Sequence, residues 1–297
     1  MLATRFKTLL LREWLQHHRG WLLTMLLPPA LFLAVLPFGH IEAPEVGSPM
    51  GLAAIATALS LVIVTAISWG MSMLQLPGLA RRDSQDRSIE FWLSLPASHS
   101  ESIGATVLTH ALLVPLMALL VGAALGLPIA AAVLLRLGGV ELLGEVSWSA
   151  LAVAELAVLL RLALGLLLAT LWLAPLFMLP MAASAWLKRW GVPAVLATVV
   201  IGGNVLAKVY GNPIFWTLLG AQARGASGAL FTGNEQLREL LRDQPHSAAE
   251  FGSGMVQWAW QDGLGALQQL ASPHLLGGLL VAAACFALLV LRRRRAA

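Results

Sequence analysis

Long runs of apolar residues, separated by short polar stretches, follow one another along most of the chain. An α-helix needs about 20 such residues to cross a bilayer. Because the runs are continuous and do not alternate apolar with polar positions, they favour helices over a membrane β-barrel. The pattern predicts an all-α integral membrane protein with a single domain over residues 1–297. Its predicted membrane-spanning helices are residues 21–38, 50–76, 105–130, 162–187, 192–219 and 274–291.

The residues before the first span, 4–19, predict an amphipathic helix that lies along the membrane surface. At about 100° per residue, basic side chains gather on one side of this helix and aromatic and leucine side chains on the other. Such a basic face suits anionic lipid headgroups. A cleaved secretory signal is the competing interpretation, but no small-residue cleavage site follows Phe38. The predicted membrane-interface residues are Arg5, Arg12, Trp14 and Arg19.

A polar stretch at residues 77–104 separates the second and third predicted spans, yet the aromatic pair Phe91-Trp92 lies in its middle. We interpret this loop as a docking element for another protein, because aromatic anchors can fill a pocket while surrounding charges fix the register. The alternative is that both aromatic residues anchor the loop at the membrane interface, as Trp often does. The predicted docking residues are Arg81, Arg82, Asp83, Asp86, Arg87, Glu90, Phe91, Trp92 and Leu95.

Two further regions are not predicted to cross the membrane as full-length helices. Residues 136–158 mix three glutamates with apolar residues, which suggests a half-buried interfacial or re-entrant segment. Residues 220–272 are more polar and are predicted to lie outside the cytoplasm, with one helical piece at 235–242. This outer region is interpreted either as a lid over a transport pathway or simply as a folded loop.

Composition and charge support the membrane assignment and give it an orientation. Only 11% of the 297 residues are charged and the mean hydropathy is +0.79, whereas soluble domains carry about a quarter charged residues. Most of the 19 Lys and Arg residues fall on the side that would carry both termini and the 77–104 loop. Because basic residues gather in cytoplasmic loops, both termini are predicted to be cytoplasmic. The net charge of +4 therefore indicates contact with the lipid bilayer and no nucleic-acid partner.

No catalytic motif stands out, and we predict that the chain is not an enzyme and holds no metal or cofactor. HExxH, P-loop and GxSxG patterns are missing from the sequence, and the single Cys285 rules out an intrachain disulfide. His17 and His18 are expected to face lipid headgroups, which is favoured over metal binding. His110 is expected to be a neutral, hydrogen-bonded packing residue, with a functional titratable group as the alternative.

Other polar residues near the predicted spans have structural interpretations. Arg161 and Lys208 are expected to snorkel towards the membrane surface, with a functional role as the alternative. Asn204 and Gln75 are expected to form hydrogen bonds between helices, which is favoured over substrate binding.

Three short stretches resemble the membrane subunit of type-2 ABC transporters, which pairs with a separate ATPase. Residues 86–96, DRSIEFWLSLP, resemble its pattern of an aspartate and small polar residues followed by FW and SLP. Residues 182–189, AASAWLKR, resemble the SAW-plus-basic stretch that ends the fourth span, and Ser272-Pro273-His274 resembles the opening of the last span. The order of elements is also similar to that family. Thr109-His110 departs from it, since a Ser-Lys-like pair is expected at the start of the third span.

The resemblance implies a permease subunit that exports an unknown substrate across the bacterial inner membrane. It implies that an ATP-binding subunit docks on a coupling helix within residues 77–104, and that ATP belongs to that subunit. It also implies that a second copy, or a related permease, completes the pathway. Two alternatives stay open: a secondary transporter or channel, and a membrane assembly protein, both without an ATPase.

Overall fold

A computed structural model of the chain describes residues 2–39, 48–85, 98–232, 237, 239–240 and 247–295. All regular structure within these residues is helical. The main helices are α1 (Leu2–Val35), α2 (Pro49–Gln85), α4 (His99–Leu108), α5 (Val114–Gly144), α6 (Trp148–Leu187), α7 (Gly191–Ala197), α8 (Gly203–Lys208), α9 (Ile214–Leu230), α11 (Ala248–Gln268) and α12 (Pro273–Arg294). Short π-helical turns, η1 (Thr109–Leu113) and η3 (Thr198–Gly202), join α4 to α5 and α7 to α8.

Five helical stretches within the described residues are long and apolar enough to cross a membrane. They are Arg5–Val35, Pro49–Arg81, His99–Gly144, Trp148–Lys208 and Pro273–Arg294. The prediction of an all-helical protein with several membrane-spanning helices is therefore confirmed at this level. The fourth stretch contains both α6 and α7–α8, and the chain turns between them at Lys188, which has a φ of 55°.

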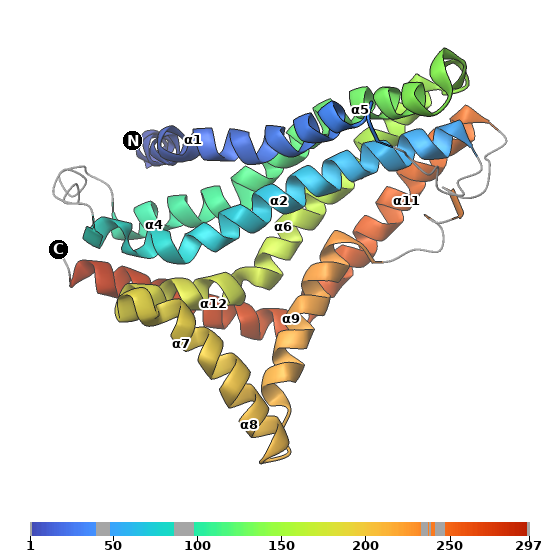
Figure 1. Cartoon of the computed structure of the whole chain (residues 1–297). Helices are drawn as coiled ribbons and strands as arrows, with labels where there is room; N and C mark the ends of the chain where they lie inside the picture. The colour runs from blue at the N-terminus through green and yellow to red at the C-terminus, as the bar shows by residue number, and fades with distance from the viewer. Residues whose placement is uncertain are drawn as a thin grey trace.

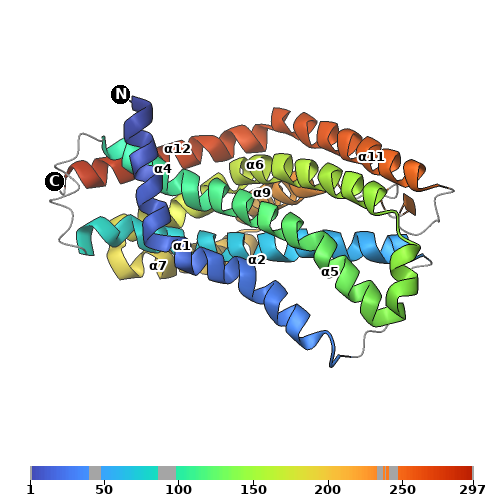
Figure 2. The same ribbon diagram turned by 90° about the horizontal axis from the view of Figure 1, so that it is seen from above.

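Helices α2, α4–α5, α6 and α12 extend in a common direction as a bundle (Figures 1 and 2). Both ends of the described chain lie at one end of this bundle, together with the last turns of α2 and the first turn of α4 (Figure 1). Helix α11 packs on the first half of α6, where Trp258 and Phe251 join the largest hydrophobic core. Helices α7–α8 and α9 diverge from the bundle and meet at a tip (Figure 1).

Close packing of α2 against α5 depends on small residues. A Cβ atom at Gly122 would lie 2.9 Å from the Leu61 Cα atom and 3.0 Å from the Ser60 carbonyl oxygen. The Ser60 hydroxyl donates a hydrogen bond to the Gly122 carbonyl oxygen at 2.9 Å. Glycine at this position therefore lets the two backbones approach closely, as is common between membrane helices.

Several helix boundaries differ from the predicted ones. Helix α2 continues through Pro77 to Gln85, so the first part of the 77–104 loop is helical. The 136–158 segment is divided between the end of α5, which kinks at Gly138 and Gly139, and the start of α6 at Trp148. The predicted span at 192–219 is not one helix, because the chain turns between α8 and α9. Gly211, with a φ of 65°, and Pro213 lie in this turn, and both residues favour turns over helices.

Helix α1 is continuous across the predicted boundary between the surface helix and the first span. Every fourth residue of one stripe is buried or half-buried: Leu9, Glu13, His17, Trp21 and Met25. This i, i+4 spacing places the stripe on one face of the helix, towards the protein. Figure 2 shows that α1 bends and that its first part crosses α4 at an angle to the bundle.

Candidate functional site

The predicted docking loop is only partly within the described residues. Arg81, Arg82 and Asp83 belong to the last turns of α2, and the Arg81 side chain is half-buried. The other predicted docking residues lie outside the described residues: Asp86, Arg87, Glu90, Phe91, Trp92 and Leu95. Where the description resumes, Ser98 caps α4 and forms a capping box with Glu101. Such a box fixes where the chain enters the helix.

The four predicted membrane-interface residues lie in different environments. Arg5 and Arg19 are exposed and Trp14 is half-buried. Arg12 is only 7% exposed, and its Nη2 atom lies 2.6 Å from Oε1 of Glu13. The prediction that Arg12 faces lipid is therefore wrong, because a buried carboxylate beside it turns the guanidinium towards the protein.

Glu13 lies at the centre of a buried polar cluster where α1 meets the third helix. Its side chain is fully buried. Besides the Arg12 guanidinium, Oε1 accepts a hydrogen bond from the Thr106 hydroxyl at 2.8 Å. The other oxygen, Oε2, lies 3.7 Å from Nε2 of His110 and 3.8 Å from Nδ1 of His17. The Glu13 carboxylate thus has a cationic donor, Arg12, and a neutral donor, Thr106, at Oε1. Two imidazoles, of His110 and His17, lie near Oε2.

His110 is fully buried in the π-helical turn η1, and α2 supplies its second partner. The Ser72 hydroxyl donates to the His110 carbonyl oxygen at 2.7 Å and lies 3.2 Å from Nδ1. The expectation of a hydrogen-bonded, buried histidine therefore agrees with the structure. Nε2 has no hydrogen-bond partner among the described residues. Single π-helical turns such as η1 are often found at functional sites.

His17 faces this cluster and His18 does not. The His17 ring makes an edge contact with His110, with centroids 5.1 Å apart, and stacks on Trp21. The His18 ring instead stacks on Trp14. The expectation that both histidines face lipid headgroups is therefore wrong for His17, because the helix stripe that carries Glu13 also carries His17. The ligand atoms of Glu13, His17 and His110 all lie within 4.8 Å of one another.

A second buried ionic cluster joins α6 to α11. Nε and Nη2 of Arg161 both lie 2.6 Å from Oδ2 of Asp262, and Nη1 donates to the Ala229 carbonyl oxygen at 2.9 Å. Oδ1 of Asp262 accepts hydrogen bonds from the backbone N–H and the hydroxyl of Thr232. Arg161 is only 2% exposed, so the prediction that it snorkels to the membrane surface is wrong. The reason is that α9 and α11 fold back over α6 and bring Asp262 to it.

Other predicted polar contacts have mixed outcomes. Lys208 is exposed at the end of α8. The Asn204 amide donates to the Val200 carbonyl oxygen of its own helical segment at 2.7 Å, so this bond does not connect two helices. A bond between helices is made instead by Gln222, which was not predicted and which donates to the His274 carbonyl oxygen at 2.8 Å.

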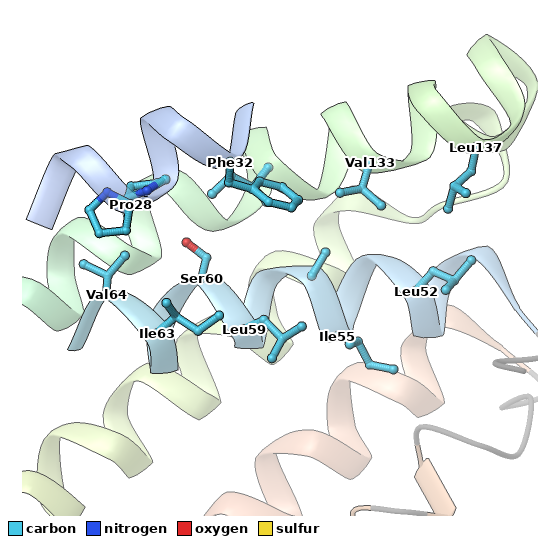
Figure 3. A pocket seen from close by; sticks show the side chains of 13 residues that line it. Pro28, Phe32, Leu52, Ile55, Leu59, Ser60, Ile63, Val64, Val133 and Leu137 are labelled. Carbon is cyan, nitrogen blue, oxygen red and sulfur yellow. The ribbon is translucent and has the colours of Figure 1, made fainter. Parts of the chain in front are cut away.

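An apolar groove of about 290 Å³ lies between α1, α2 and α5 (Figure 3). Its labelled lining residues are Pro28, Phe32, Leu52, Ile55, Leu59, Ser60, Ile63, Val64, Val133 and Leu137. Ser60 is the polar member of this lining, and its hydroxyl is bonded to the Gly122 carbonyl oxygen. The groove can therefore accommodate hydrocarbon, such as a lipid chain, but offers no charged group to a polar ligand.

Sequence reasoning missed Glu13, Thr106, Ser72 and Asp262 as site residues. The signal for Glu13 was present, since it is the one acidic residue in the basic 4–19 segment. Its partners Thr106 and His110 are 93 and more residues away in the sequence, and no spacing rule connects them to it.

Comparison with known proteins gives no relative for this chain: no family model, curated protein or solved structure matches it.

Proposed function

We propose that this chain is the permease subunit of a type-2 ATP-binding-cassette transporter in the bacterial inner membrane. In this proposal both termini are cytoplasmic, and a separate ATPase docks on residues 77–104. Two permease chains, either identical or related, form the export pathway. ATP is bound and hydrolysed by the partner, and the chain itself is not an enzyme.

The observation that carries the proposal is the position of the two helix ends that flank the docking loop. The last turns of α2 and the first turn of α4 lie at the same end of the bundle as both chain ends (Figure 1). Basic residues are concentrated in the last turn of α12, at Arg292, Arg293 and Arg294. Because basic residues favour the cytoplasmic side, this end is the one that a cytoplasmic ATPase would meet.

The continuity of α2 supports a way to transmit force from the loop. The helix extends from Pro49 to Gln85 without a break, and it packs against α5 and α6. A movement imposed at its last turns would therefore shift a helix that contacts most of the bundle. The capping box at Ser98 and Glu101 holds the other end of the loop in a defined direction.

The first test is to change the aromatic pair in the loop. We expect the double variant Phe91→Ala, Trp92→Ala to lose co-purification with a Walker-motif ATPase encoded beside this chain, because both pocket-filling side chains are removed. It should also lose at least about tenfold of the permease-dependent ATP hydrolysis in proteoliposomes, as expected for removal of hot-spot residues. Co-purification and vanadate-sensitive phosphate release are the measurements.

A matched control removes an exposed Phe and Trp elsewhere. Phe38 is 85% exposed and Trp260 is 70% exposed, and the variant Phe38→Ala, Trp260→Ala should keep full complex formation. Equal loss in both double variants would indicate a general defect and contradict docking. Full coupling in the loop variant, or a genome with no neighbouring ATPase, would overturn the proposed function.

A further inference from the structure

We propose that Glu13, His17 and His110 form a binding site for one divalent transition-metal ion of the zinc class. The site lies where α1 meets α2 and the π-helical turn of the third helix. It does not rest on the proposed transport function, since it is argued from contacts among described residues alone.

The first step concerns the proton positions on His110. The single hydroxyl proton of Ser72 points to the His110 carbonyl oxygen at 2.7 Å, so the hydroxyl can only accept a hydrogen bond from Nδ1. That assignment places a proton on Nδ1. Nε2 is fully buried with no hydrogen-bond partner among the described residues and faces Oε2 of Glu13 at 3.7 Å. A buried imidazole nitrogen and a carboxylate oxygen that face each other in this way are satisfied by a proton or a metal cation between them.

The second step concerns distances. Zinc binds nitrogen and oxygen ligands at about 2.0–2.2 Å, so two ligand atoms of a tetrahedral ion are about 3.4 Å apart. Oε2 of Glu13 lies 3.7 Å from Nε2 of His110 and 3.8 Å from Nδ1 of His17. The three ligand atoms all lie within 4.8 Å of one another, so side-chain movements of up to about 1 Å bring them to the spacing of a tetrahedral ion. Nδ1 of His17 also lies 3.2 Å from the Glu13 carbonyl oxygen, and metal binding there replaces that contact by a metal–nitrogen bond.

The third step concerns the groups behind the ligands. A histidine that binds metal normally donates its other ring N–H to an oxygen, and a ligating carboxylate is normally hydrogen-bonded. Ser72 fills the first role for His110. Arg12 and Thr106 fill the second role, because both hold Oε1 of Glu13 and leave Oε2 directed towards the imidazoles. The supporting shell of a metal site is thus in place.

The ligand set also selects the ion. Two imidazole nitrogens and one carboxylate oxygen suit zinc and its neighbours, whereas Mg²⁺ and Ca²⁺ prefer oxygen ligands only. The Arg12 charge opposes any cation, so binding requires the strong metal–nitrogen bonds of a transition metal. The side chain of His17 is 23% exposed, which gives an ion a route into the site.

The test is metal binding by the full chain in detergent, purified with a tag that contains no histidine. After treatment with a chelator and desalting, Zn²⁺ stoichiometry is measured by mass spectrometry, and Co²⁺ is used as a coordination probe by visible absorption. We expect one Zn²⁺ per chain and the intense visible bands of four-coordinate Co²⁺. His17→Gln, on the half-exposed member of the site, should weaken Zn²⁺ binding at least about tenfold. Glu13→Gln and His110→Gln should abolish it, and Arg12→Gln should strengthen it.

His18→Gln is the matched control, because the neighbouring His18 stacks on Trp14 and is not a member of the Glu13–His17–His110 cluster. It should bind Zn²⁺ like the unmodified chain. Equal loss with His18→Gln and His17→Gln would identify a surface histidine pair and overturn the proposal. No Zn²⁺ binding by the unmodified chain would also overturn it. If the variants of the fully buried Glu13 and His110 do not fold, His17→Gln still tests the proposal, because the His17 side chain is partly exposed.

Discussion

Within the part of the chain that the structure describes, the carboxylates of Glu13 and Asp262 are buried beside arginines, and their surroundings differ. Asp262 is held by Arg161, by Thr232 and by a backbone N–H, and Arg161 is itself bonded to the Ala229 carbonyl oxygen. The Glu13 oxygen Oε1 accepts from Arg12 and Thr106 at 2.6 and 2.8 Å, while two imidazoles stand 3.7 and 3.8 Å from Oε2. The first cluster joins α6 to α9 and α11, whereas the second joins α1 to α4 and to the π-helical turn η1.

This difference indicates different roles. A buried ion pair offsets the cost of desolvation only when geometry is good and the remaining polar atoms are satisfied. In the Arg161–Asp262 cluster both carboxylate oxygens accept hydrogen bonds, and Nη2 of Arg161, which makes none with the described residues, lies 2.6 Å from Oδ2 of Asp262. We therefore interpret this cluster as a structural connection between α6 and α11. In the Glu13 cluster the ring nitrogen Nε2 of His110 makes no hydrogen bond within the described part of the chain and faces Oε2 of Glu13 at 3.7 Å, a separation that a metal ion can bridge.

The largest expected effect is at the structural cluster. Arg161→Met leaves the Asp262 carboxylate buried without its cation, and this should lower the free energy of unfolding by about 3–5 kcal/mol. Arg161→Met combined with Asp262→Leu should recover much of that loss, because no unpaired charge is left. The measurement is unfolding in mixed detergent–SDS micelles.

Arg224→Met on α9 is the control for this variant, since Arg224 is exposed, and it should stay within about 0.5 kcal/mol. An Arg161→Met protein as stable as this control would mean that the α6–α11 connection is not structural.

A smaller effect is expected at Glu13. In the presence of a chelator, Glu13→Gln should cost about 2 kcal/mol, because a neutral amide oxygen can still accept from Arg12 and Thr106 but without the charge. The same unfolding assay measures it. If Glu13→Gln lowered the free energy of unfolding as much as Arg161→Met, the two clusters would contribute equally to stability, and the proposed difference in their roles would be wrong. Added Zn²⁺ should then raise the melting temperature of the unmodified chain and not of Glu13→Gln.

The smallest effects compare two threonine hydroxyls that donate to the two carboxylates. Thr232→Val should cost about 1.5 kcal/mol and Thr106→Val about 1 kcal/mol, since each removes one hydrogen bond to a charged group. Thr198→Val is the control, because the Thr198 hydroxyl is exposed and bonds only to the Ala194 carbonyl oxygen of its own helix. A larger loss of unfolding free energy for Thr106→Val than for Thr232→Val would contradict the interpretation that the hydrogen bonds to Asp262 matter more for stability than those to Glu13.

The sequence predicted the fold class because membrane helices leave a strong signal in hydropathy. The predicted spans 50–76, 105–130 and 274–291 fall within α2, α4–α5 and α12, which extend beyond them. Hydropathy did not predict the turn between α8 and α9, because the residues on both sides are equally apolar. The Gly211-Asn212-Pro213 turn signal was available there, and it was outweighed by the length of the apolar run.

The polar clusters were harder to predict, for a physical reason. Glu13 stands out as the one acidic residue of the 4–19 segment, but a carboxylate on a basic surface helix has the same sequence pattern whether it faces headgroups or the protein. Arg161 was interpreted from its position in a span alone, because Asp262 lies 101 residues later in a region that was interpreted as an outer loop or lid. Tertiary contacts between distant segments decided both cases.

Helix α1 contributes to two separate places: Glu13 and His17 belong to the polar cluster, and Pro28 and Phe32 line the apolar groove. Since one helix carries both, a molecule in the groove that shifts α1 must also change the affinity of the cluster for an ion. Thermodynamic linkage makes this influence mutual: an ion at the cluster must change the affinity of the groove by the same factor. Lipid composition and metal supply are therefore expected to act on this protein as coupled variables.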